Sequence, residues 1–144
     1  MSAPISDRAT LLRTMNPVLH EGAFVFVSVP AENDISGLEV VAAVLEDEGW
    51  SLVLRETDAR ARGFASRFRA AWITLTVASD LHAVGLTAAV AQALAAAGIA
   101  CNVIAGAHHD HLFVPVEQSA QAMSALRALQ ASGGPPRKET PRGQ

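Results

Sequence analysis

The stretch WITLTVASDLHAVGLTAAVAQALAAAGIACNVIAGAHHDHLFVP, from Trp72 to Pro115, decides the fold because it holds the clearest secondary-structure pattern of the chain. Apolar and polar residues alternate over Trp72–Val77, which predicts a strand covered on one face. The Ala-rich segment Gly85–Ala97 repeats apolar residues at helical spacing and is followed by Gly98, a residue suited to a left-handed helix cap. The stretch therefore begins with a strand and a helix.

Two more strands and a second helix follow. Ile99–Ala105 is short and apolar, and His111–Val116 alternates again. The loop between them, around Gly106 and Asp110, is short enough to join the two strands as an antiparallel hairpin. The amphipathic segment Glu117–Gln130 predicts the second helix. The order strand, helix, strand, strand, helix is most of a ferredoxin-like βαββαβ unit.

These residues resemble the ACT domain, a small-molecule sensing module of amino-acid metabolism. The resemblance rests on the segments WITLTV, AVGLTAAVAQAL, AAAGIACNVIAG and HDHLFVP. It is strongest to the paired ACT units of aspartate kinases and TOR-pathway arginine sensors, and to small bacterial ACT proteins of unassigned activity. The resemblance implies an α+β fold of two interlocked ACT-like units, with antiparallel sheets and helices on one face. We expect an incomplete N-terminal unit over residues 1–68, a C-terminal ACT domain over 69–131 and a disordered tail over 132–144.

An ACT unit ends in a fourth strand, and the C-terminal half does not contain one. After Leu129 the chain is rich in Ser, Gly, Pro and charged residues. The fourth strand must therefore come from the N-terminal half or from another chain. Together with the Ala-rich helix faces, this gap favours a homodimer.

The ACT resemblance covers the N-terminal half only loosely, through the segments FVFVSV and EDEGWSLVL. Ser6 or Asp7 can cap a short helix that includes Leu11, Leu12 and Met15, and Ala23–Val29 and Trp50–Leu54 predict strands. The segment 38–48 has two interpretations. A capping-box spacing from Ser36 and helical recurrence of apolar residues favour a helix, whereas its β-branched valines and the ACT resemblance favour a strand.

Composition excludes several classes of function. The net charge of −3 argues against a nucleic-acid-binding surface, and no apolar run is long enough to span a membrane. Cys101 is the single cysteine, so no internal disulfide can form, and the N-terminus lacks the features of a signal peptide. A cytoplasmic protein is expected. The chain has no nucleophile elbow, phosphate loop or dinucleotide-binding motif, which favours a non-catalytic protein without a cofactor.

A free amino acid carries a carboxylate and an ammonium on one carbon, so its binder needs N–H donors close to an acceptor. The start of a helix at Gly85 offers free N–H groups, and Asp110 can accept the ammonium. The ACT resemblance implies a site between two facing units, made by one loop and one strand. The corresponding residues are Ala83, Val84, Gly85, Leu86 and Thr87 in the loop, and Asn102, Val103 and Ile104 in the strand. Alternatively, Gly85 only caps a helix and Asp110 only forms a turn.

The histidine-rich hairpin offers a second hypothesis, a metal-binding protein or a metal-dependent enzyme. Strand alternation places His109 and His111 on one face and Asp110 on the other, so a third ligand would have to come from His82 or from a partner chain. In a simpler interpretation, the histidines of the hairpin hydrogen-bond to backbone groups. A third hypothesis is a dimerisation or docking module that binds no ligand.

Overall fold

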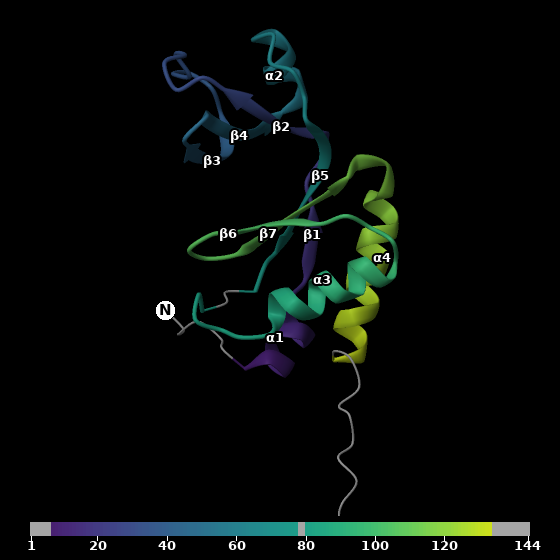
Figure 1. Cartoon of the computed structure of the whole chain (residues 1–144). Coiled ribbons are helices and arrows are strands. Elements are labelled where there is room, and N and C mark those ends of the chain that lie inside the picture. Colours follow the sequence, from purple (N-terminus) through teal and green to yellow (C-terminus); the bar gives the residue numbers. More distant parts are fainter. Residues whose placement is uncertain (1–6, 78–79, 134–144) are drawn as a thin grey trace, which may run out of the picture.

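The computed structural model describes residues 7–77 and 80–133 (Figure 1). Its helices are α1 (Arg8–Thr14), α2 (Glu56–Ala61), α3 (Leu86–Ala96) and α4 (Ser119–Ser132), the last preceded by the short 3-10 helix Val116–Gln118. Its strands are β1 (Pro17–Leu19), β2 (Phe24–Val29), β3 (Val40–Glu46), β4 (Gly49–Arg55), β5 (Phe68–Leu75), β6 (Asn102–Ala105) and β7 (Asp110–Pro115). The predicted tail over 132–144 lies almost entirely outside these residues.

All seven strands form one antiparallel sheet, in the order β3-β4-β2-β5-β7-β6, with β1 also paired to β5. β5 is the central strand and serves both halves of the chain. Its start, from Phe68 to Ala70, pairs with β2, and the remainder pairs with β7 on one side and β1 on the other. β5 begins four residues before the predicted strand Trp72–Val77, because its first residues pair with β2 of the N-terminal half.

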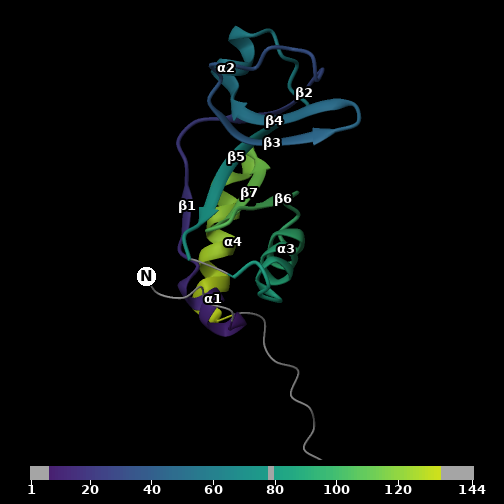
Figure 2. The same ribbon diagram turned by 90° about the vertical axis from the view of Figure 1, so that its left-hand side faces the viewer.

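The C-terminal half is a ferredoxin-like unit. Its strands β5, β6 and β7 and helices α3 and α4 follow the predicted order, and β1 lies beside β5 where the fourth strand belongs (Figure 2). The N-terminal half repeats the strand arrangement with β2, β3, β4 and the start of β5, but a loop replaces its first helix. The predicted α+β fold of two interlocked units is confirmed.

The missing fourth strand comes from the N-terminal half of the same chain. Thr76 fixes the entry to β1, because its backbone N–H donates to the Met15 carbonyl at 2.8 Å and its hydroxyl to the Asn16 carbonyl at 2.9 Å. The Gln130 amide in α4 donates to Asn16 Oδ1 at 2.7 Å. A second chain is therefore not needed to complete the sheet, which removes one of the two reasons given above for a dimer.

The helix favoured on residue grounds for the segment 38–48 is wrong, and the strand interpretation is right. Ser36 does not cap a helix: its backbone N–H and hydroxyl both donate to Asp34 Oδ1, at 2.9 and 2.6 Å, which is a local turn. β3 then pairs with β4 along its length, with a bulge between Val40 and Ala42. The helical spacing of the apolar residues is misleading because β3 is an edge strand, and Leu45 is 62% exposed.

Helices cover one face of the sheet, and the other face is concave. The buried core of the C-terminal half packs α1, α3 and α4 against β5 and β7, and α2 packs against β2 and β4 in the same way. Strands β3 and β4 curl over β6 and β7, so the uncovered faces of the two halves meet (Figures 1 and 2). Their contact buries a third, aromatic cluster around Phe24 and Phe113. Within the described ranges, no helix is long and apolar enough to cross a membrane.

Candidate functional site

A small cavity lies at the end of α3 where the helix begins, on the helix-covered side of the sheet. Four of the predicted residues line it, and the structure adds three more. The lining residues are Ala83, Leu86, Thr87 and Asp110, together with Asp80, Leu81 and Ala105. Its volume is about 80 Å³. Helix N–H donors and carboxylate acceptors therefore meet at one point, as the chemistry of an amino-acid head group requires.

The start of α3 is open toward this cavity. The first N–H groups of an α-helix have no partner within the helix, and among the described residues no side chain caps this end of α3. The positive end of the helix dipole adds to the attraction for an anion. α3 begins here because Gly85 adopts φ +103°, a left-handed conformation that few other residues accept.

Arg8, at the start of α1, packs directly against Gly85. A Cβ built on Gly85 would lie 2.7 Å from Arg8 Cδ and 3.1 Å from Arg8 Nε. The glycine therefore allows a guanidinium to approach the N-terminal end of α3. Sequence reasoning missed this residue and Asp80. Arg8 lies 77 positions from Gly85, and nothing in the local pattern joins the two segments.

Asp110 is the first residue of β7 and is 9% exposed. It is paired with Ala105 in the hairpin, and its side chain shares the helix-covered face with the buried Leu112 and Val114. A carboxylate at this depth in the sheet is unusual, since buried charges require partners. Asp110 thus lies beside the start of α3, in the cavity that Leu86 and Thr87 also line.

The other predicted residues lie outside the cavity. Val84 is 83% exposed at the surface of the loop. On the edge strand β6, alternation separates the three predicted residues: Val103 packs against the helix-side core, while Asn102 and Ile104 line other hollows on the concave face. A single chain therefore does not bring Asn102, Val103 and Ile104 to the loop Ala83–Thr87.

His111 belongs to a hydrogen-bonded group on the concave face. Trp72 Nε1 donates to His111 Nδ1 at 3.1 Å, and the Thr74 hydroxyl lies 3.1 Å from the same nitrogen. Thr74 also lies 2.7 Å from His20 Nε2, and the His20 ring stacks on Trp72 at 3.5 Å. Burial lowers the pKa of both His20 and His111, and the nearby His109 lowers that of His111 further. The group favours neutral imidazoles.

The metal hypothesis finds little support in this geometry. Within residues 7–77 and 80–133, no three His, Cys, Asp or Glu side chains gather as metal ligands do. His109 precedes β7, and its carbonyl accepts the Gly106 N–H at 2.9 Å in the hairpin turn. His111 uses Nδ1 for Trp72 instead. Cys101 is no better placed for chemistry, because burial raises the pKa of its thiol to about 11.

Two models of the ACT domain match the chain, one over residues 3–71 and one over residues 67–128. The chain belongs to the ACT domain family. Its two ACT units are paired within one chain, as the sheet shared through β5 shows. No curated protein sequence matches the chain.

Solved structures support the same assignment of these ACT units. A Vibrio cholerae protein of unknown function, described as a possible transport protein, is 44% identical, with a TM-score of 0.75 over 85% of this chain and 94% of that one. The regulatory subunits of aspartate kinase from Thermus thermophilus and Thermus flavus are 12% and 13% identical, with TM-scores of 0.59 and 0.54. These matches cover 81% and 78% of this chain, and 98% and 95% of theirs. At these sequence identities, the similarity to the two regulatory subunits shows a shared fold and nothing more. The ACT family itself supports a regulatory, ligand-binding role.

Proposed function

We propose that this protein is a non-catalytic regulator that binds an amino acid, or a closely related small molecule, at the loop Ala83–Thr87. The observation that carries the proposal is the cavity in which the start of α3 meets Asp110. The ligand carboxylate binds to the free N–H groups of the helix, and Arg8 adds a positive charge beside them. The ligand ammonium binds to Asp110, with Asp80 as a second acceptor.

The size of the cavity limits what one chain can hold. Ligand sites usually have volumes of about 300–1,000 Å³, whereas this cavity has about 80 Å³. It accommodates the head group of an amino acid and leaves the ligand's side chain outside. A second surface must therefore cover the side chain.

A second copy of the chain supplies this surface in the proposal. β6 is an edge strand, so its outer backbone groups have no neighbouring strand within the described sheet. A strand edge of this kind pairs readily with another chain or with a ligand. In a homodimer, Asn102, Val103 and Ile104 of one protomer face the loop Ala83–Thr87 of its partner, as the ACT resemblance implies. The site then contains all nine of the residues predicted from the sequence.

A cytoplasmic location is part of the proposal. The single cysteine suits a reducing compartment, where disulfides are rare. Free amino acids and the enzymes that they regulate also share that compartment. The regulated partner is a protein whose activity changes with the ligand-bound state of the dimer.

The proposal is tested by thermal shift of the tag-free protein against the twenty amino acids and common divalent metals. A ligand at one hundred times its dissociation constant adds about 2.7 kcal/mol to the free energy of unfolding, a shift that is easily measured. Stabilisation by one amino acid, abolished in Asp110→Asn, is the expected result. Stabilisation by a metal alone would favour the histidine hairpin. If neither stabilises the protein, it acts as a docking module.

A further inference from the structure

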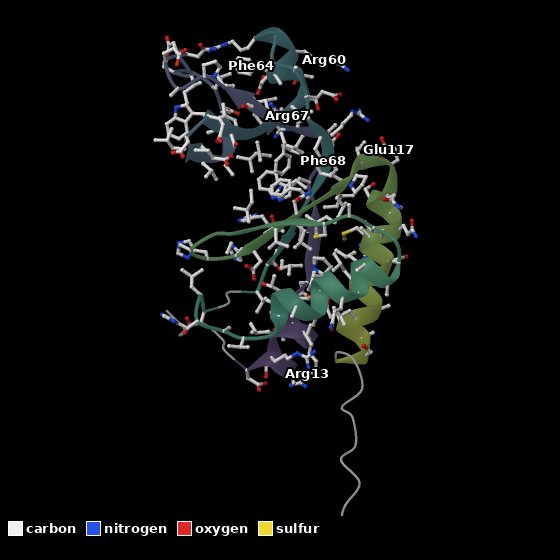
Figure 3. All side chains as sticks on the ribbon, viewed as in Figure 1. Arg13, Arg60, Phe64, Arg67, Phe68 and Glu117 are labelled. Atoms are coloured by element: carbon white, nitrogen blue, oxygen red, sulfur yellow. The ribbon has the colours of Figure 1, made fainter. Side chains whose placement is uncertain are left out.

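A second and larger cavity lies on the concave face, between the N-terminal strands and the edge strand β6. Its volume is about 470 Å³, within the range of small-molecule sites. Residues of β2, β4 and the start of β5 line it on one side, and Asn102 of β6 lines it on the other. Figure 3 shows Arg67 and Phe68 at this junction, far from α1 and its Arg13. The cavity shares no lining residue with the cavity beside Asp110.

Two glutamates are held on the wall of this cavity by the hairpin between β3 and β4. Glu46 ends β3 and Glu48 follows in the turn. The turn lies against the end of β2, where only a glycine fits at position 49, since a Cβ there would collide with the Val29 carbonyl oxygen. Ser51 donates its hydroxyl to Glu46, which orients that carboxylate. The fold therefore fixes the turn that carries both glutamates, and Ser51 orients Glu46.

Arg67 provides an opposite charge in the same cavity. Its backbone N–H donates to the Phe26 carbonyl at 2.8 Å, which ties the residue to β2. Two neighbouring arginines already have partners. Arg69 forms an ion pair with Glu56 at 2.5 Å, and Arg62 donates a hydrogen bond to the Ser36 carbonyl at 3.0 Å. The Arg67 guanidinium, by contrast, has neither an ion pair nor a hydrogen bond to any described residue.

The floor between these charges is apolar. Phe26 and Phe68 line the cavity and meet edge to face, with ring centroids 5.6 Å apart. Both rings are partly buried and pack against the aromatic cluster that joins the two halves of the sheet. A hydrocarbon chain lying on them would lose contact with water, which is favourable at about 25 cal/mol per Å² of apolar surface buried.

We propose that this groove is a second binding site, for a small zwitterion whose ammonium and carboxylate are separated by a hydrocarbon stem. The ammonium binds between Glu46 and Glu48, the carboxylate binds to Arg67, and the stem lies on Phe26 and Phe68. Asn102 adds an amide that can hydrogen-bond to either end. This site is complete in one chain and goes beyond the proposed function, with whose residues it shares Asn102 alone.

The test is isothermal titration of the full chain with 6-aminohexanoate, with hexanoate and hexylamine as probes that each lack one charge. We expect 6-aminohexanoate to bind, and each single-charge probe to bind at least about tenfold more weakly, because a charge-assisted hydrogen bond is lost. Arg67→Gln and Glu48→Gln should each weaken 6-aminohexanoate binding by at least about tenfold.

Matched controls separate this site from the rest of the molecule. Arg127→Gln and Glu32→Gln remove one charge of each sign from exposed positions outside the groove and should leave the dissociation constant unchanged. Asp110→Asn should also leave it unchanged, although that variant is expected to weaken binding at the other cavity. Failure of 6-aminohexanoate to bind at millimolar concentration would overturn the proposal. Equal affinity in Arg67→Gln and Glu48→Gln would overturn it as well.

Discussion

At the scale of single residues, the most constrained polar group of the molecule is the set formed by His20, Trp72, Thr74 and His111. Because the Trp72 N–H donates to His111 Nδ1, that nitrogen has to be unprotonated, and the ring carries its proton on Nε2. A second proton on His111 would face the Trp72 donor and break the bond. Burial is the main reason why the pKa of each histidine is lowered, and the Trp72 bond also disfavours a second proton on His111.

A pH dependence of stability follows. In the unfolded chain, the imidazoles take up protons near their ordinary pKa of 6.5, whereas in the fold they stay neutral to lower pH. The unfolded state then binds more protons, so the free energy of unfolding is highest above pH 6.5 and falls as the pH drops from there through the lowered pKa values. Urea denaturation between pH 8 and 5 measures this. His111→Gln should flatten the profile, whereas His82→Gln, at an exposed position, should not. An unchanged profile in His111→Gln would contradict the account.

Gly85 is expected to tolerate no side chain. Gly85→Ala forces a left-handed conformation on a residue with a Cβ, at a cost of about 1–2 kcal/mol, and also drives that Cβ into Arg8. Gly98→Ala is the matched control, because Gly98 also has positive φ but no neighbouring atom within 4 Å of an added Cβ. Chemical denaturation should show a larger loss for Gly85→Ala than for Gly98→Ala. Equal losses would mean that the Arg8 contact is unimportant.

The predicted residues that the structure brings into one cavity lie close together in the chain or follow a strong period. Leu86, Thr87 and Asp110 fall in one cavity because a helix start and a hairpin were both recognisable from their patterns. Nothing in the local sequence around His20 indicates that its ring stacks on Trp72. Such contacts depend on β1 lying beside β5, and no local signal predicts that pairing.

At the scale of elements, the C-terminal half was predictable and the N-terminal half was less so. From Trp72 onward, apolar residues recur about every 3.6 residues in the helices and every second residue in the strands. β1 has only three residues and was missed, because a strand that short has no period to detect. β3 was ambiguous because an edge strand exposed on both faces has no buried stripe to distinguish it from a helix.

Helix α4 stabilises the C-terminal half through a buried stripe. Leu126 is fully buried and packs in the helix-side core with Leu11, Leu12 and Ile73. Leu126→Ala should therefore cost about 2–5 kcal/mol of unfolding free energy, the usual range for a buried leucine. Leu45→Ala, in the exposed part of β3, should change it by less than about 0.5 kcal/mol. Urea denaturation of both variants checks this, and a small effect of Leu126→Ala would argue against the described packing of α4.

At the scale of the whole molecule, the chain is a pair of ACT units joined through one sheet, whose concave face and helix-covered face each carry a cavity. The proposed dimer uses the edge of β6. Val103→Pro would remove a backbone donor that points outward from that edge, because the hydrogen-bonded pairs of the hairpin are Gly106–His109, Ile104–His111 and Asn102–Phe113. Light scattering at micromolar concentration should therefore show a dimer for the wild type and a monomer for the variant. Cys101→Ser, just before β6, is the control. A monomeric wild type would contradict the dimer.

The central claim is that an amino acid binds where α3 meets Asp110. The most direct measurement is isothermal titration of the tag-free protein with whichever amino acid stabilises it most in the thermal screen, for the wild type, Asp110→Asn and the surface control Glu39→Gln. We predict that the wild type and Glu39→Gln bind with the same affinity, and that Asp110→Asn loses at least about tenfold, the cost of removing a buried charged acceptor. Equal affinity in Asp110→Asn, or no binding by the wild type, would contradict the claim.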